Sequence, residues 1–185
     1  AAMRENLAEI DAIANDPAPP TFENTLAAME RAGRALDRVQ TVFGVFASTM
    51  STPPVQAVER EMAPRMAELG DRIVQNEALF RRIEAVYETR ASLTPEQQRL
   101  AWLYHTEFVR AGARLDAAAK ARLSEINQSL ASLFTQFSQN ILADEDSQRL
   151  VLDSKDDLAG LPQSLRDVAA ADAEEKGLAG KWVIS

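Results

Sequence analysis

The chain has 185 residues, of which 46% are hydrophobic and 26% charged, and its formal net charge is −8. This length and composition are typical of a globular domain with a substantial core, and they exclude a disordered chain. The acidic balance and the lack of a basic stripe argue against nucleic acid and against a membrane surface as partners. Because the chain has no cysteine, disulfides, zinc ribbons, Fe–S clusters and thiol nucleophiles are excluded together.

No apolar run approaches the roughly 18 residues that cross a membrane. No charged-then-apolar leader opens the chain either. We therefore expect a cytoplasmic protein, and we leave a periplasmic location open because the leading AAM need not be the natural N-terminus.

Helical periodicity dominates from the first residues. Leu7, Ile10 and either Ile13 or Ala14 share one face of a helix that should end at a run of three prolines, Pro17, Pro19 and Pro20. Proline lacks an amide donor and disfavours helix in the residue before it, so the chain must be extended here. Thr21 then offers a side-chain oxygen to cap a new helix.

We predict that this second helix runs as one element over about 22–49. Its apolar stripe has Gly33 in a vacant slot, and a glycine inside a helix costs about 1 kcal/mol against alanine, which favours close approach of another helix. The stripe consists of Leu26, Met29, Leu36, Val39, Phe43, Phe46 and Met50.

A third helix should begin at STPP, 51–54, with its prolines in the first turn. Pro64 interrupts its stripe, so we expect a bend or break near Ala63. Met62 and Met66 lie on that stripe, and we interpret them as core residues. A further helical stripe follows at 79–87.

LTPEQQ, at 93–98, predicts a helix start in which Thr94 is the cap and Gln97 completes a capping box. Gly112 should end this helix, and Asp116 should cap the next one over about 117–143. The predicted fold is mainly α: an elongated bundle of long antiparallel helices.

The sequence changes character after residue 143. Leu150 to Leu152 and Trp182 to Ile184 are the expected extended segments, with a helix between them over 162–175 that ends at Gly177. These two strands form a minor β element near the C-terminus and are candidates for pairing with each other. We predict two regions: an N-terminal helical domain, 1–143, and the start of a following strand–helix–strand region, 144–185.

The only histidine, His105, is the natural candidate for a metal ligand or general base. Zincins require a second histidine four residues on, deaminases require cysteines, and di-iron bundles require a glutamate at position 102, where the chain has Trp102. We therefore interpret His105 as a polar or half-buried helical residue.

Other chemistry also lacks a motif. There is no G-x-S-x-G nucleophile elbow and no glycine-rich phosphate loop. The carboxylates at 144–146, 153, 156 and 157 lack the spacing of an EF-hand, so we interpret them as a solvated acidic turn. We accordingly predict no catalytic, cofactor-binding or metal-binding residue.

Several stretches, taken together and in order, resemble a known family: ENLAEIDAIANDPAPPTFENTLAAME, VQNEALFRRI, LTPEQQRLAWLYHTEFVRAGARLD, AKARLSEINQSLASLFTQFSQNIL, DDLAGLP and GKWVIS. They resemble the N-terminal region of the thimet oligopeptidase family of zinc metallopeptidases. FENT and FVRAGARLD are more similar to its bacterial peptidyl-dipeptidase branch than to oligopeptidase A.

The resemblance implies a non-catalytic part of a peptidyl-dipeptidase, an enzyme that releases C-terminal dipeptides from short peptides. The family binds zinc through His-Glu-x-x-His and a later glutamate, and this chain contains no such motif. The implied partners are the rest of the parent chain, with its catalytic zinc domain, and short peptide substrates in a channel that the N-terminal helices help to wall. A stand-alone helical interaction module without chemistry is the alternative.

Overall fold

The structure is a computed structural model that describes residues 1–184, apart from the side chain of Asp146. By the distribution of contacts it divides into two units, Ala1–Thr135 and Gln136–Ser185. The division into functional domains at residue 143 stays a prediction, and Ser185 lies outside the described residues.

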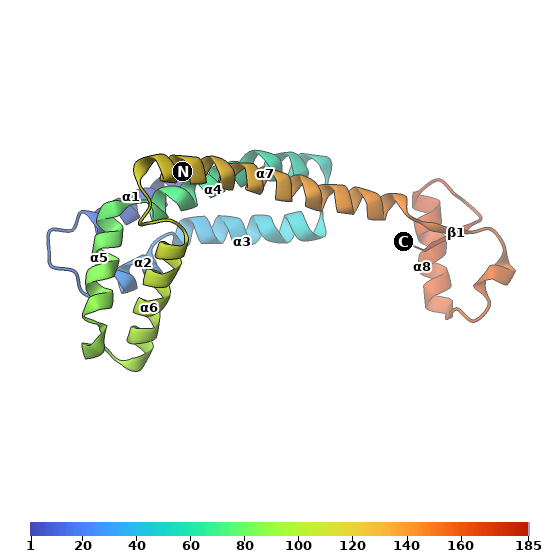
Figure 1. The fold of residues 1–185 in the computed structure, drawn as a ribbon. Helices are drawn as coiled ribbons and strands as arrows, with labels where there is room; N and C mark the ends of the chain where they lie inside the picture. Colours follow the sequence, from blue (N-terminus) through green and yellow to red (C-terminus); the bar gives the residue numbers. More distant parts are fainter. Residues whose placement is uncertain (185) are drawn as a thin grey trace. The chain divides into compact units, whose positions relative to one another are not determined.

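The first unit is entirely helical, as Figure 1 shows. Two pairs of helices that are neighbours in sequence pack side by side, Arg34–Thr49 with Pro53–Val74 and Glu77–Glu88 with Pro95–Arg110. In chain order they are α1 (Ala2–Ala14), α2 (Leu26–Arg31), α3 (Arg34–Thr49), α4 (Pro53–Val74), α5 (Glu77–Glu88), the 3₁₀ turn η1 (Arg90–Ser92), α6 (Pro95–Arg110) and most of α7 (Ala117–Ser147).

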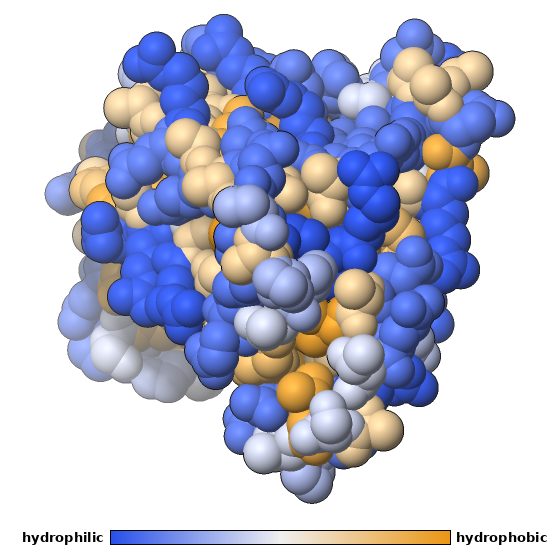
Figure 2. All heavy atoms as spheres, turned by 90° about the vertical axis from the view of Figure 1, so that its left-hand side faces the viewer, coloured by the Kyte–Doolittle hydropathy of each residue, from blue (hydrophilic) through white to orange (hydrophobic). Residues whose placement is uncertain are grey.

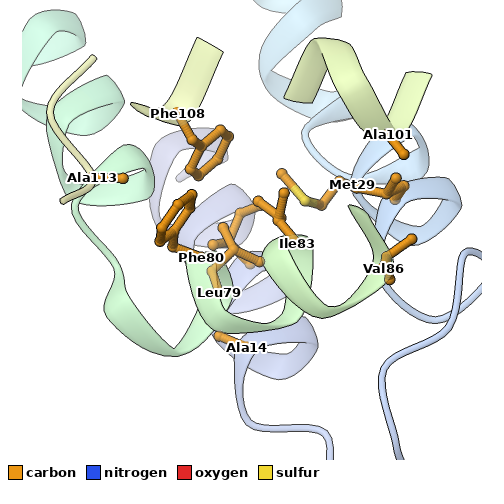
Figure 3. Packing of buried hydrophobic residues seen from close by; sticks show 11 residues of the cluster. Ala14, Met29, Leu79, Phe80, Ile83, Val86, Ala101, Phe108 and Ala113 are labelled. Carbon is orange, nitrogen blue, oxygen red and sulfur yellow. The ribbon is translucent and has the colours of Figure 1, made fainter. Parts of the chain in front are cut away.

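The core of this unit is built around α5. Leu79 and Ile83 are fully buried, and Figure 3 shows them packed with Phe80 between α1 and α6. An amphipathic helix gains most of its stability from burying such a face. The other members of the cluster are Ile10, Ala14, Leu26, Met29, Val86, Ala101, Phe108 and Ala113.

The helix starts predicted at Thr94 and Asp116 are confirmed. Thr94 and Gln97 form the reciprocal capping box that begins α6. The carboxylate of Asp116 accepts the amide of Ala119 at 2.8 Å and so caps α7. Local sequence signals decide these boundaries because each cap satisfies amides that have no partner within the helix.

The single helix predicted over 22–49 is wrong. The chain is helical in α2 and again in α3, and between them Gly33 adopts a left-handed conformation with φ of 79°. A Cβ at this position would lie 2.9 Å from the side-chain nitrogen of Asn6 on α1. Glycine therefore serves two needs here, a positive φ and close approach of a neighbouring helix.

The break predicted near Pro64 is also wrong, because α4 continues from Pro53 to Val74 with Pro64 inside it. A proline in a helix interior removes one hydrogen bond, yet neighbouring turns can keep the helix continuous. The bend stays a prediction. Helix α7 is confirmed but extends to Ser147, four residues beyond the predicted end.

The second unit contains the end of α7, β1 (Leu150–Leu152), the 3₁₀ turn η2 (Lys155–Leu158), α8 (Gln163–Glu175) and β2 (Trp182–Ile184). The two strands pair antiparallel, with Val151 opposite Val183. Val183 is buried together with Ala169 and Ala173, two residues of α8. The predicted strands, their pairing and the mainly α fold are therefore confirmed.

Within the described residues, none of the helices combines the length and the apolar composition needed to cross a membrane.

Candidate functional site

Arg82, on α5, is a buried arginine that holds the proline-rich linker between α1 and α2. Its Nη1 donates to the carbonyl oxygens of Asp16 at 2.8 Å and Ala18 at 3.0 Å, and its Nη2 lies 3.4 Å from the Asp16 carboxylate. The side chain is only 7% exposed, so these bonds form away from water, where they are strong. Sequence reasoning missed Arg82 because nothing distinguishes it from its exposed neighbour Arg81.

The linker is also ordered locally. The hydroxyl of Thr21 accepts the amide of Asn24 at 3.1 Å, and the Asn24 side chain accepts the amide of Thr21 at 2.7 Å. The predicted cap at Thr21 therefore forms, although it caps a turn and the helix begins only at Leu26. The linker is thus fixed at both ends of the proline run.

His105, on α6, lies partly buried among aromatic rings, as the sequence predicted for a helical histidine. Its ring stacks on Tyr87 with a centroid separation of 4.0 Å, and it lies 5.9 Å from the ring of Phe80. The guanidinium of Arg90 lies 3.8 Å from the centre of the Tyr87 ring. These contacts join α5 to α6 through stacking and cation–π attraction.

Charge surrounds the same imidazole. Arg114 donates to the Glu84 carboxylate at 2.7 Å and also lies 3.3 Å from Nε2 of His105. Burial, and then the positive charge of Arg114, lower the pKa of His105 below its usual range. His105 therefore favours the neutral form, held against an arginine cation.

The residues present do not fit a catalytic zinc ion. Such a site needs about three protein ligands from histidine, cysteine or carboxylate groups and an open position. The described residues include no group of three or more of these side chains that could hold a metal, and the single imidazole has Arg114 as its neighbour.

A polar contact joins α4 to the start of α7. Asn127 donates to the Asp71 carboxylate at 2.6 Å, and the Gln75 side chain donates to the carbonyl of Lys120 at 3.2 Å. The Lys120 ammonium is buried and lies 3.3 Å from the Glu77 carboxylate. Such hydrogen-bonded groups fix the register of two helices more than they add stability.

An apolar groove of about 500 Å³ runs between α3 and α4. Met62 and Met66 line it and are half buried, so they do not belong to the closed core in which the sequence analysis put them. Val39 and Phe43 face them from α3. The groove can accept apolar side chains, and its lining carries no group for covalent or acid–base chemistry apart from Glu59.

Comparison with known proteins identifies relatives along nearly the whole chain. It is 40% identical over 184 residues to "Dipeptidyl carboxypeptidase" of Salmonella typhimurium, and 39% identical over 184 residues to the protein of the same name from Escherichia coli; each alignment covers 98% of this chain. It is 27% identical over 178 residues to "Organellar oligopeptidase A, chloroplastic/mitochondrial" of Arabidopsis thaliana, with 90% of this chain covered.

The chain spans about a quarter of the length of these relatives, 27% for both bacterial proteins and 22% for the plant protein. No family model matches the chain. The resemblance to dipeptidyl carboxypeptidases and oligopeptidases A noted in the sequence is confirmed, and it concerns their N-terminal part.

Proposed function

We propose, from the premise that this chain is related to the N-terminal part of dipeptidyl carboxypeptidases and oligopeptidases A, that it is the non-catalytic N-terminal part of a peptidase. The parent protein would release C-terminal dipeptides from short peptides. The observation that carries the proposal is the 40% identity over 98% of the chain, combined with coverage of only 27% of the relative.

In this proposal the helical unit helps to wall the channel through which peptides reach the catalytic domain. A wall must hold its shape while substrate passes, and the closed core around α5 and the Arg82 contacts to the linker provide that rigidity. In this proposal zinc and its ligands belong to the remainder of the parent protein, which would carry the His-Glu-x-x-His motif. A cytoplasmic location stays a prediction.

The alternative is a helical interaction module without chemistry. The observation that favours it is that residues of α1, α2, α5 and α6 already form a closed core within this chain. A module of this kind would fold and bind partners without further domains. The gene separates the two possibilities, because the peptidase proposal requires a reading frame that continues past residue 185 into His-Glu-x-x-His.

The activity test compares the 185-residue chain with the protein encoded by the complete reading frame. Both are assayed for release of the C-terminal dipeptide from a blocked tetrapeptide, and zinc binding is measured by calorimetry. We expect turnover and stoichiometric zinc only in the longer protein. Turnover by the 185-residue chain would overturn the non-catalytic role, and an inactive longer protein would overturn the peptidase assignment.

A further inference from the structure

The groove between α3 and α4 leaves an unusual amount of apolar side chain exposed. Val39, Val42 and Phe46 of α3, and Met50 directly after its last residue, are each between 49% and 58% exposed. At 100° per residue the three helical positions lie on one side of the helix, next to the residues that line the groove. Single exposed apolar residues are ordinary, whereas a continuous row along a groove marks an interaction surface.

The contrast with another face of the molecule supports this conclusion. Figure 2 looks onto the side where α5 and the proline-rich linker lie, and that face is mainly hydrophilic, with apolar residues scattered over it. In α3, by comparison, only Leu36 is buried. The apolar row on α3 adjoins a groove that already has a second wall in α4. Helix α7 also exposes apolar side chains, among them Leu133 and Phe134, so what distinguishes the α3 row is the groove beside it.

We propose that this groove and the apolar row of α3 form the docking surface for an amphipathic helix of the same polypeptide, from the part of the protein beyond the region aligned here. The inference rests on the proposed function, since it assumes the longer parent chain. About three quarters of each bacterial relative lies outside the aligned region, because the alignment covers 27% of its length. That remainder is long enough to supply such a helix.

The chemistry of the groove favours this occupant over a short peptide substrate. A peptide that is cut near its C-terminus presents a free carboxylate, which needs a cationic or strongly donating partner. The residues that line the groove include no lysine or arginine, and their one charged member is Glu59, an acid. A helix presents no free terminus to the groove and can place an apolar stripe along it.

A second copy of the chain is also disfavoured. Two copies that meet through the same surface would bring together chains of net charge −8 each, which repel one another at low ionic strength. A helix of the same polypeptide suffers no loss of translational freedom on docking, so a modest apolar contact is sufficient.

Cysteine labelling tests the proposal, and the chain has no cysteine of its own. Val42→Cys reports on the apolar row, and Thr41→Cys is the control, since Thr41 is exposed and lies outside the row, about 100° around α3 from Val42. Each variant is made in the 185-residue chain and in the protein from the complete reading frame. The rate of maleimide modification at each position is followed by peptide mass spectrometry.

We expect both positions to react at similar rates in the 185-residue chain. In the longer protein the cysteine at position 42 should react at least about tenfold more slowly, while the control at position 41 keeps its rate. Equal reactivity of position 42 in both proteins would overturn the proposal. Protection already present in the 185-residue chain, rising with its concentration, would also overturn it, in favour of a second copy.

A second variant keeps the result independent of labelling chemistry. Phe46→Asp should lower the melting temperature of the longer protein by several degrees more than that of the 185-residue chain, in which Phe46 is already 49% exposed. An equal effect in both proteins would contradict the proposal. Dipeptide release by the unmodified longer protein is measured separately. If that protein is inactive but position 42 is still protected, the peptidase proposal fails and the docking surface stands. If it is active and position 42 is not protected, the docking proposal fails alone.

Discussion

The helices packed around α5 (the closed half of the first unit) use their apolar residues differently from α3 and the groove beside it (the open half). Helix α5 buries Leu79, Phe80, Ile83 and Val86 against α1 and α6, whereas α3 buries Leu36 alone and leaves a row of apolar side chains at the solvent. Both helices carry amphipathic stripes of similar quality in the sequence. An apolar stripe in the sequence therefore indicates which face of a helix will be buried. Only the structure shows whether the residues that bury it belong to this part of the chain.

The largest expected effect is a large-to-small substitution in the closed half. Ile83→Ala removes a fully buried side chain and should lower the free energy of unfolding by about 3 to 4 kcal/mol, as core truncations that leave a cavity do. Val42→Ala, in the exposed row, should change it by no more than about 0.5 kcal/mol. Urea unfolding followed by circular dichroism measures both free energies of unfolding. Similar decreases for the two variants would contradict the difference in packing between the two halves.

Arg82→Ala tests the attachment of the linker to the closed half. It removes two charge-assisted hydrogen bonds to backbone carbonyls and should cost about 2 kcal/mol, with the contribution of the Asp16 carboxylate reduced by its partial exposure. Arg81→Ala is the matched control on the same helix and should be close to neutral. The same unfolding experiment measures both, and limited proteolysis should cut the linker faster only in the Arg82 variant.

Two glycines, Gly33 at the N-terminal cap of α3 and Gly44 inside the helix, give smaller effects of opposite sign. Gly33→Ala forces a side chain into a left-handed conformation and against Asn6, and should destabilise by about 1 to 2 kcal/mol. Gly44→Ala lies inside α3 where a Cβ meets nothing within 4 Å, and should stabilise by about 0.5 to 1 kcal/mol. Thermal unfolding measures both shifts, and the same sign for both would show that one of the two environments is misassigned.

The smallest expected effect is the pH dependence that His105 gives to the closed half. Burial, and then the positive charges of Arg114 and Arg90, lower the pKa of His105 in the folded chain. The carboxylates of Glu84 and Glu88 raise it, but their effect is outweighed. Between the lowered value and the ordinary value near 6.5, the unfolded chain binds more protons, so stability decreases as pH falls through this window and is fully present above it.

His105→Gln should flatten that pH dependence. Urea unfolding at pH 7.5 and at several values down to pH 5 compares the variant with the parent chain. A slope that is unchanged in the variant would show that another group titrates in this window, and a slope of the opposite sign would contradict the lowered pKa.

Much of the fold could be predicted from the sequence because local chemistry decides it. The capping box at Thr94 and Gln97, the prolines that begin α4 and the strand pair near the C-terminus each follow from signals within a few residues. The break at Gly33 could not be predicted, because it depends on Asn6 of a distant helix. Position 33 fits a helical stripe in the sequence, and only the approach of α1 explains the left-handed glycine there.

The candidate site was less accessible to sequence reasoning. The stripe through Val39 and Phe43 was found, yet no pattern within the chain tells whether a facing helix is present. The Arg82 contacts to Asp16 and Ala18 join residues more than 60 positions apart, a distance at which single-sequence periodicity carries no information. His105 was assigned to a half-buried helical position correctly, because the sequence around it lacks the partners of a zincin, deaminase or di-iron site.

Hydrogen–deuterium exchange of the 185-residue chain tests the contrast between the two halves most directly. Amides exchange at rates set by local opening, so closed and open packing separate clearly. We predict that amides of α5 exchange at least about 100-fold more slowly than those of α3 beyond Leu36, and that this part of α3 becomes protected in the longer protein. Protection of α3 equal to that of α5 in the 185-residue chain alone would contradict the account.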